Sequence, residues 1–430
     1  MKTHISILFL FIVSLAKSQT ISTVAGNGSS GFSGDDGNAT EARLNLPFNL
    51  TFDKNDNFYI ADTYNNSIRK VSSESGIITT VVGSPDKKHI HDLKTPTGLT
   101  FDNQNNLYVA DLANLRIKLI NLDYKKAMTL VGQPTETDVP NIKASLAGPI
   151  SIVFDGKNEL YITTNGDSKV ISVNIFTGDI TDIAGTGVTG YSGDGGQAKG
   201  AQLANPTGLA LDNKTLYIAD SGNERVRKVN LDTGIITTVA GTGETGFGTE
   251  GNYALKTKLS NPVGLAVDKN GDLYIVDRGN NRVIMVNKDT QLISRVTGNG
   301  EAGFSGDGDL AKNAQLSNPT GLAFNHQGDL FIVDRGNNRI RKITGLSEMQ
   351  EPVVLEDNII VYPNPAKEKV TLQVKEPLKI KDVFLYDSRG KEIKLELLDN
   401  TLNVSKLPRG IYVIRVATDN GTLEQKLVLE

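Results

Sequence analysis

The chain has 430 residues, more than one ordinary hydrophobic core accommodates, so the sequence predicts several domains or one repetitive domain. Its 45 Lys and Arg residues nearly balance its 49 Asp and Glu residues, and this balance gives no sign of a nucleic-acid partner. The sequence contains no cysteine, which excludes disulfides, thiolate zinc sites and thiol catalysis by this chain.

The N-terminal stretch MKTHISILFLFIVSLAKSQT has the pattern of a secretory signal. Lys2 precedes an apolar run over residues 5–15, and the small residues Ala16 and Ser18 stand shortly before Gln19. This order predicts a signal peptide over residues 1–18. The apolar run is too short to span a bilayer, and we expect no transmembrane segment elsewhere. The mature protein is therefore predicted to be exported.

Four short segments recur along residues 21–344. The first has the pattern Pro-x-small-Leu-x-apolar-Asp, and its six copies are PFNLTFD (47–53), PTGLTFD (96–102), PISIVFD (149–155), PTGLALD (206–212), PVGLAVD (262–268) and PTGLAFN (319–325). Each copy is followed by a segment such as LYIAD and then by one such as NERVRKV; a fourth, resembling GIITTVAG, follows the first five sets. All four are alternating or β-branched and are bounded by Gly, Asn and Asp, which predicts β-strands.

Four antiparallel strands in each repeat are typical of a β-propeller blade, and we label them a to d from the central channel outward. The sixth copy of strand d, ISTVAG at residues 21–26, stands in front of the first repeat. The sequence thus predicts an all-β fold, a six-bladed β-propeller over residues 19–344 whose N-terminal strand closes the last blade. Glycines in strand a are expected to seat the neighbouring blade; they are Gly98, Gly208, Gly264 and Gly321.

The repeat also matches a known family pattern. The order GFSGDG-x-x-A-x-x-A-x-L-x-x-P-x-G-L-A, followed by LYIAD-x-x-N-x-R-V-R-K-V, closely resembles the NHL repeat of bacterial propeller proteins. The resemblance covers residues 21–344. It implies a six-bladed propeller, in agreement with the strands counted from the repeats.

Because chain direction alternates between neighbouring strands, the b–c and d–a connections emerge on one face, which we call the loop face. Several d–a connections contain Gly-Asp turns, a short Ala/Leu segment and one aromatic residue, namely Phe32, Tyr191, Phe247 or Phe304. One interpretation is that these loops cap the blade junctions, with aspartates as N-caps or hydrogen-bond acceptors. The alternative is calcium binding, although no loop offers the ligand set of a dedicated site; its ligands would be Asp35, Asp36, Asp194, Asp307 and Asp309. We expect no cofactor.

An aspartate ends strand b in five blades, and an arginine follows five positions later in four of them. The aspartates are Asp62, Asp111, Asp220, Asp277 and Asp334, and the arginines are Arg116, Arg225, Arg282 and Arg339. Residues present in nearly every blade are best explained as scaffold contacts. Each aspartate is predicted to accept hydrogen bonds from the b–c loop and to pair with the local arginine.

Loop-face positions that differ between blades are better candidates for binding. One position after the aspartate, blades 5 and 6 carry Arg278 and Arg335, which predicts an anion- or carboxylate-binding pair on one rim. Two solvated or loop-bound arginines are the alternative. Tyr64, beside the same position in blade 1, is a further candidate binding residue.

The d–a connection after blade 1 departs from the pattern and reads GSPDKKHIHDLKTP. His89 and His91 are candidate binding residues there, with the spacing to hold a metal together with Asp86 or Asp92. Two histidines without a placed third ligand equally fit an ordinary solvated loop, and we expect no metal site.

The repeat stops at a linker over residues 345–358, and residues 359–430 contain short alternating strands that predict a small β-sandwich. The segments VYPNPAKEKVTL, VFLYDSRGKEI and LPRGIYVIRVATDNG resemble, in order, the C-terminal sorting domain of type IX secretion cargo in Bacteroidota. The resemblance implies that the secretion machinery is a partner and that the propeller is secreted or held on the outer cell surface. A plain accessory β-domain is the alternative.

Three functions follow from these features. The first is a non-catalytic binding propeller that recognises an extracellular protein, peptide or glycan through its loop face, as a monomer. The second is a lyase or lactonase, which related six-bladed propellers include; however, the middle of strand a carries no Asp, Glu or His, and His326 belongs to the opposite face. The third is a structural surface component. We predict binding, no enzymatic activity and no nucleic-acid partner.

Overall fold

The computed structural model describes residues 19–84, 93–122, 126–133, 141–346, 359–374, 379–387, 391–418 and 421–429. The predicted signal peptide, His89, His91 and most of the predicted linker lie outside these residues. Contacts divide the chain into two units, Met1–Ser347 and Glu348–Glu430, which are described separately.

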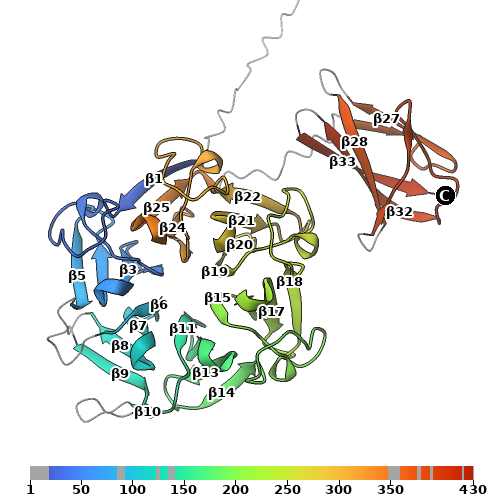
Figure 1. Cartoon of the computed structure of the whole chain (residues 1–430). Coiled ribbons are helices and arrows are strands. Elements are labelled where there is room, and N and C mark those ends of the chain that lie inside the picture. The colour runs from blue at the N-terminus through green and yellow to red at the C-terminus, as the bar shows by residue number, and fades with distance from the viewer. Residues whose placement is uncertain are drawn as a thin grey trace, which may run out of the picture. The chain divides into compact units, whose positions relative to one another are not determined.

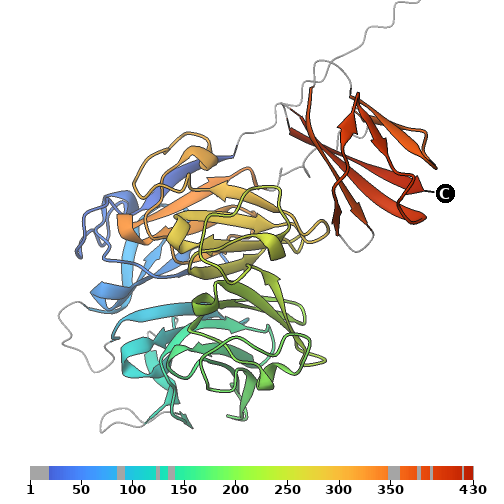
Figure 2. The same ribbon diagram turned by 45° about the vertical axis from the view of Figure 1, so that its right-hand side comes forward.

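The described part of the first unit contains six sheets arranged around an axis (Figures 1 and 2). Blade 1 contains β2 (Leu50–Phe52), β3 (Phe58–Asp62), β4 (Ser67–Val71) and β5 (Ile78–Gly83). Blade 2 contains β6 (Pro96–Phe101), β7 (Asn106–Asp111), β8 (Arg116–Asn121), β9 (Lys126–Gly132) and the short β10 (Ile142–Lys143). Blade 3 contains β11 (Pro149–Phe154), β12 (Glu159–Thr164), β13 (Lys169–Asn174) and β14 (Ile180–Ala184).

Blades 4 to 6 repeat this antiparallel order. Blade 4 contains β15 (Pro206–Asp212), β16 (Thr215–Asp220), β17 (Arg225–Asn230) and β18 (Ile236–Ala240). Blade 5 contains β19 (Pro262–Val267), β20 (Leu273–Asp277), β21 (Arg282–Val286) and β22 (Ile293–Thr297). Blade 6 contains β23 (Leu322–Phe324), β24 (Leu330–Asp334) and β25 (Arg339–Thr344) together with β1 (Thr20–Ala25).

The N-terminal strand belongs to the last blade, as the repeat count predicted. β1 pairs antiparallel with β25, and its register sets Ile21 opposite Ile343. The inner strands contact one another in the order β2, β6, β11, β15, β19, β23, and β23 contacts β2 again. Blade 6 is therefore the neighbour of both blade 5 and blade 1.

Apolar cores lie between neighbouring blades. Ala219 and Val226 of blade 4, for example, belong to one buried cluster with Ile275 and Ile284 of blade 5. The glycines of strand a permit this approach: a Cβ on Gly98 would lie 2.6 Å from the carbonyl oxygen of Ile150 in the next blade. The predicted role of these glycines is therefore seen in the structure.

Two sets of short 3-10 helices lie in the b–c and d–a connections of the loop face. One set follows each b strand: η2 (Thr63–Asn65), η3 (Leu112–Asn114), η4 (Asn165–Asp167), η6 (Ser221–Asn223), η8 (Arg278–Asn280) and η10 (Arg335–Asn337). The other set lies in the d–a connections, where the Ala/Leu segments predicted helical turns: η1 (Ala39–Glu41), η5 (Ala198–Gly200), η7 (Ala254–Lys256) and η9 (Ala311–Asn313). No helix among the described residues is long and apolar enough to cross a membrane.

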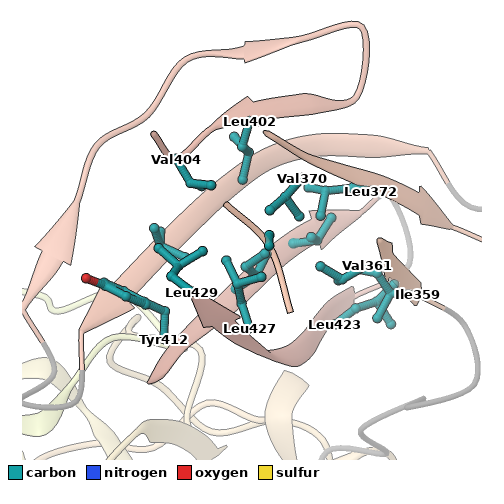
Figure 3. Packing of buried hydrophobic residues seen from close by; sticks show 14 residues of the cluster. Ile359, Val361, Val370, Leu372, Leu402, Val404, Tyr412, Leu423, Leu427 and Leu429 are labelled. Atoms are coloured by element: carbon teal, nitrogen blue, oxygen red, sulfur yellow. The ribbon is translucent and has the colours of Figure 1, made fainter. Parts of the chain in front are cut away.

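The second unit is a sandwich of two antiparallel sheets. One contains β26 (Ile359–Tyr362), β27 (Lys369–Val374), β31 (Thr401–Asn403) and β30 (Leu397–Leu398); the other contains β29 (Glu392–Ile393), β28 (Ile380–Asp387), β32 (Gly410–Thr418) and β33 (Gly421–Leu429). Val370 and Leu402 from the first sheet pack with Tyr412 and Leu427 from the second (Figure 3). The predicted β-sandwich is confirmed.

Candidate functional site

The aspartate that ends strand b is a buried hydrogen-bond acceptor. In blade 4, Asp220 accepts from the backbone N–H of Ala204 at 2.7 Å and from the side-chain amide of Asn223 at 2.8 Å. Ala204 belongs to the preceding d–a connection, and Asn223 belongs to the b–c loop. The aspartate thus ties both loop-face connections to its blade, and Asp62, Asp111, Asp277 and Asp334 do the same.

The arginine partner of this aspartate is the predicted one in only two blades. Arg116 donates to Asp111 at 2.8 Å, and Arg282 donates to Asp277 at 2.7 Å. Arg225 and Arg339 instead donate to backbone carbonyls, at 2.6 Å to Thr242 for Arg225 and at 2.8 Å to Asn27 for Arg339. The predicted pairing of Arg225 with Asp220 and of Arg339 with Asp334 is therefore wrong.

A second arginine, seven positions after the aspartate, takes that place in blades 1, 4 and 6. Arg227 is fully buried and lies 2.6 Å from Asp194 and 3.4 Å from Asp220. Arg69 and Arg341 repeat this arrangement with the equivalent aspartates of their own blades. Sequence reasoning missed these residues. The available signal was the joint occurrence, within one blade, of Ser-Gly-Asp in the d–a connection and this arginine in strand c.

The Gly-Asp turns therefore have a scaffold role. The d–a connection of blade 4 runs along β18, where Gly195 donates to the Ile236 carbonyl, and this contact places Asp194 over Arg227. Asp35 and Asp307 make the equivalent ion pairs, whereas Asp36 and Asp309 are exposed. Over the residues that the structure covers, no group of three His, Asp or Glu side chains is arranged to hold a metal.

The aromatic residues of the same connections cover arginines. The guanidinium carbon of Arg225 lies 3.9 Å from the ring centroid of Tyr191, and that of Arg339 lies 3.7 Å from the ring centroid of Phe304. Phe247 covers Arg282 in the same way. Arg225 and Arg339 are thus scaffold residues after all, held by carbonyls and a ring instead of by the aspartate.

The position after the aspartate differs in role from blade to blade. Thr63 of blade 1 donates to the Pro96 carbonyl of blade 2 at 2.8 Å, and Ser221 of blade 4 donates to the Pro262 carbonyl of blade 5 at 2.5 Å. These buried hydroxyls join one blade to the first residue of the next inner strand. In blades 5 and 6 the same position carries Arg278 and Arg335, and neither makes this contact.

Arg278 and Arg335 are half-buried and stand at the starts of η8 and η10, in neighbouring blades. Burial lowers the pKa of Arg278, and the positive charge of Arg335 lowers this pKa further. No described residue accepts a hydrogen bond from either guanidinium, and no described carboxylate lies within ion-pair distance of them. The Nε atom of Arg335 is buried without a hydrogen-bond partner.

Tyr64 from η2 of blade 1 completes this group. Its ring centroid lies 5.7 Å from the guanidinium carbon of Arg335, and 56% of the residue is exposed. The structure therefore brings together three of the five predicted binding residues, from blades 5, 6 and 1. We call Arg278, Arg335 and Tyr64 the arginine–tyrosine cluster. The other two, His89 and His91, lie outside the described residues.

Two of the hollows among the described residues are lined at least in part by inner strands. The larger, of about 280 Å³, is lined by inner strands, with Asn49, Thr100, Ser151 and Thr207 among its polar residues, and it has no charged residue or histidine in its lining. The smaller, of about 130 Å³, contains His326 in the turn between β23 and β24. The Nδ1 atom of His326 lies 2.6 Å from a carboxylate oxygen of Asp56.

Comparison with known proteins gives two family matches. The NHL repeat matches residues 259–284 and 316–343, and a secretion system C-terminal sorting domain matches residues 360–430. Protein SUPPRESSOR OF QUENCHING 1, chloroplastic, from Arabidopsis thaliana is 28% identical over 411 residues, which cover 92% of this chain and 34% of that protein. NHL repeat-containing protein 2 from Homo sapiens is 28% identical over 35% of this chain and 22% of its own length. The chain thus spans about a third or less of these relatives.

Solved structures share the fold. A protein of unknown function from Bacteroides thetaiotaomicron has a TM-score of 0.59 at 18% identity, and an auxiliary nutrient binding protein from Bacteroides ovatus has a TM-score of 0.57 at 17% identity; each alignment covers 76% of both chains. At these identities the likeness concerns the fold alone. Together, the matches and the six sheets show that the chain carries an NHL-repeat propeller followed by a type IX secretion sorting domain.

Proposed function

We propose that the chain is an exported propeller that binds an extracellular ligand through its loop face and has no catalytic activity. The sorting domain over residues 360–430 supports delivery to the cell exterior or the outer surface. The binding role rests on the arginine–tyrosine cluster: two neighbouring cationic side chains without a protein partner, beside an exposed ring.

The lining of the axial hollow supports a non-catalytic role. It consists of aliphatic, aromatic, hydroxyl and amide side chains together with glycine. General acid–base catalysis needs a group that gains or loses a proton near the working pH, and none of these side chains does so. Binding by shape and hydrogen bonds needs no such group.

Screening the full chain against glycan and peptide arrays tests this function. Wild-type protein should bind a small set of ligands, and the Arg278→Gln/Arg335→Gln variant should lose them. The matched control is Lys228→Gln, which removes an exposed charge from β17 in blade 4 and should bind as wild type does. Binding that survives in the double variant would refute the role of the loop face, and turnover of a bound ligand would refute the non-catalytic role.

A further inference from the structure

The arginine–tyrosine cluster lacks the negative charge that accompanies the deeply buried arginines. Arg69, Arg227 and Arg341 each contact two carboxylates within the protein. Arg278 and Arg335 contact none among the described residues, although each lies partly out of water on neighbouring blades. Two guanidiniums in this state favour an anion that the described part of the protein does not supply.

The hydrogen-bonding state of the cluster indicates a side-chain site for a small anion. A guanidinium carries five N–H donors, and none of those of Arg278 or Arg335 has an acceptor among the described residues. A carboxylate accepts two parallel N–H bonds from one guanidinium in a fork geometry and has lone pairs left for a second one. A carboxylate bound by Arg278 and Arg335 would therefore supply both the negative charge and the hydrogen-bond acceptors that these guanidiniums lack within the described residues.

The backbone beside the cluster is already used, which argues against a peptide main chain as ligand. Gly279 and Gly336, which follow the two arginines, donate their N–H groups to the carbonyls of Ser260 and Ser317 at 2.8 Å. The backbone N–H groups that close the two 3-10 turns are also used, because those of Asn281 and Asn338 donate to the carbonyls of Arg278 and Arg335. The arginines follow β20 and β24, which are inner members of their described sheets and not the edge strands to which a peptide strand adds.

The ring of Tyr64 gives the site a flat, half-apolar platform next to the cations. An aromatic ring with a wet edge suits a ligand that is itself apolar on one side and polar on the other. A pyranose ring has such a C–H face, and a uronic acid adds a carboxylate at the edge of that ring. One uronic acid residue therefore offers a C–H face for Tyr64 and a carboxylate for the arginines.

We propose that Arg278, Arg335 and Tyr64 bind a uronic acid residue of an acidic glycan, with its carboxylate between the guanidiniums and its ring over Tyr64. This inference rests on the proposed binding function and names its ligand class. Gly279 and Gly336, which follow the two arginines, are exposed.

Isothermal titration of the full chain with trigalacturonate tests the inference, with fully methyl-esterified trigalacturonate as the matched ligand. The ester keeps the rings and removes the charges, so we expect binding of the acid and at least about tenfold weaker binding of the ester. Arg278→Gln and Arg335→Gln should each weaken acid binding about tenfold or more, Tyr64→Ala should weaken it several-fold, and Lys228→Gln should leave it unchanged.

Several outcomes would overturn the inference. Equal binding of acid and ester, or acid binding that is unchanged in both arginine variants, would show that the cluster does not bind the carboxylate. Binding of inorganic sulfate or of a peptide C-terminal carboxylate at this cluster, with no binding of trigalacturonate, would reject the sugar acid and keep the proposed function. Absence of every ligand in the array screen as well would reject both. The comparison of acid with ester uses wild-type protein and does not depend on the folding of a variant.

Discussion

Arg335 and Arg341 belong to the same blade, yet the fold uses them in opposite ways. Arg341 is fully buried, and its guanidinium contacts Asp307 and Asp334. Arg335 is half-buried, faces Tyr64 and has no carboxylate partner among the described residues. Burial with paired acids makes one arginine part of the scaffold, and the lack of such partners leaves the other free for a ligand.

Blades 1, 4 and 5 show the same division. Blades 1 and 4 have the buried arginine in strand c but a small hydroxyl, Thr63 or Ser221, at the loop-face position. Blade 5 has the reverse, with Arg278 on the loop face and Ile284 in strand c. The two positions vary independently, so the loop-face arginines are not a by-product of the scaffold.

The largest expected effect concerns the scaffold arginines. Arg227→Gln should destabilise the propeller by roughly 3–5 kcal/mol, because it leaves the buried Asp220 without its cation. Urea unfolding of the propeller transition measures this loss. Adding Asp220→Asn to the same chain should recover part of it, since the orphaned charge is then gone. Additive losses in the double variant would contradict the ion-pair account.

A smaller effect is expected from the loop carboxylate. Asp194→Asn should cost about 1–3 kcal/mol, because the side chain keeps its acceptor oxygen but loses the charge that Arg227 contacts. Thermal unfolding of wild type and variant checks the loss. EDTA should not change the wild-type melting temperature, whereas a drop with EDTA that is absent in the variant would restore the calcium alternative.

The buried aspartates give a pH dependence of known sign. Burial raises the pKa of Asp334 to about 6, against the lowering effects of Ser317, Asn337 and Arg341. An unfolded aspartate titrates near pH 4, so between about pH 6 and 4 the native state binds more protons than the unfolded state. The contribution to stability is present at low pH and is lost as the pH rises through about 6. Wild type should therefore gain stability relative to Asp334→Asn between pH 7 and pH 5 in urea titrations, and an opposite or zero difference would contradict this assignment.

The smallest expected effect concerns the loop-face arginines. Arg278→Gln removes one of two neighbouring like charges and no hydrogen bond within the described residues. We expect a stability change of about 0.5 kcal/mol or less, in the stabilising direction. Differential scanning calorimetry is sensitive enough to check it. A clear loss of stability would mean that Arg278 has a scaffold role.

The blades and their number could be predicted because each repeat carries its own strand and turn signals. The missing d strand of blade 6 and its extra copy at residues 21–26 also predicted the pairing of β1 with β25. That pairing makes blade 1 the neighbour of blade 6, which is why Tyr64 lies beside Arg335. The candidate cluster was thus within reach of the repeat pattern.

The choice between the two arginines of strand c was not within reach of local spacing. Arg225 stands opposite Asp220 in the strand register, which favours it as the partner. However, residues two apart point to the same side of a strand, so Arg227 has the same direction. A third segment decides between them: the d–a connection brings Asp194 to Arg227, and Tyr191 covers Arg225. Because this contact joins distant segments, spacing within strands b and c does not reveal it, and only the joint occurrence of Ser-Gly-Asp and the second arginine pointed to it.

Urea unfolding of Arg335→Gln and Arg341→Gln, measured side by side with wild type, tests the division between the two kinds of arginine most directly. The same substitution, six positions apart in one blade, should leave the propeller as stable as wild type in the first case. In the second case it should remove roughly 3–5 kcal/mol. Equal losses in the two variants would show that Arg335 is scaffold as well, and would contradict a loop face that is free to bind a ligand.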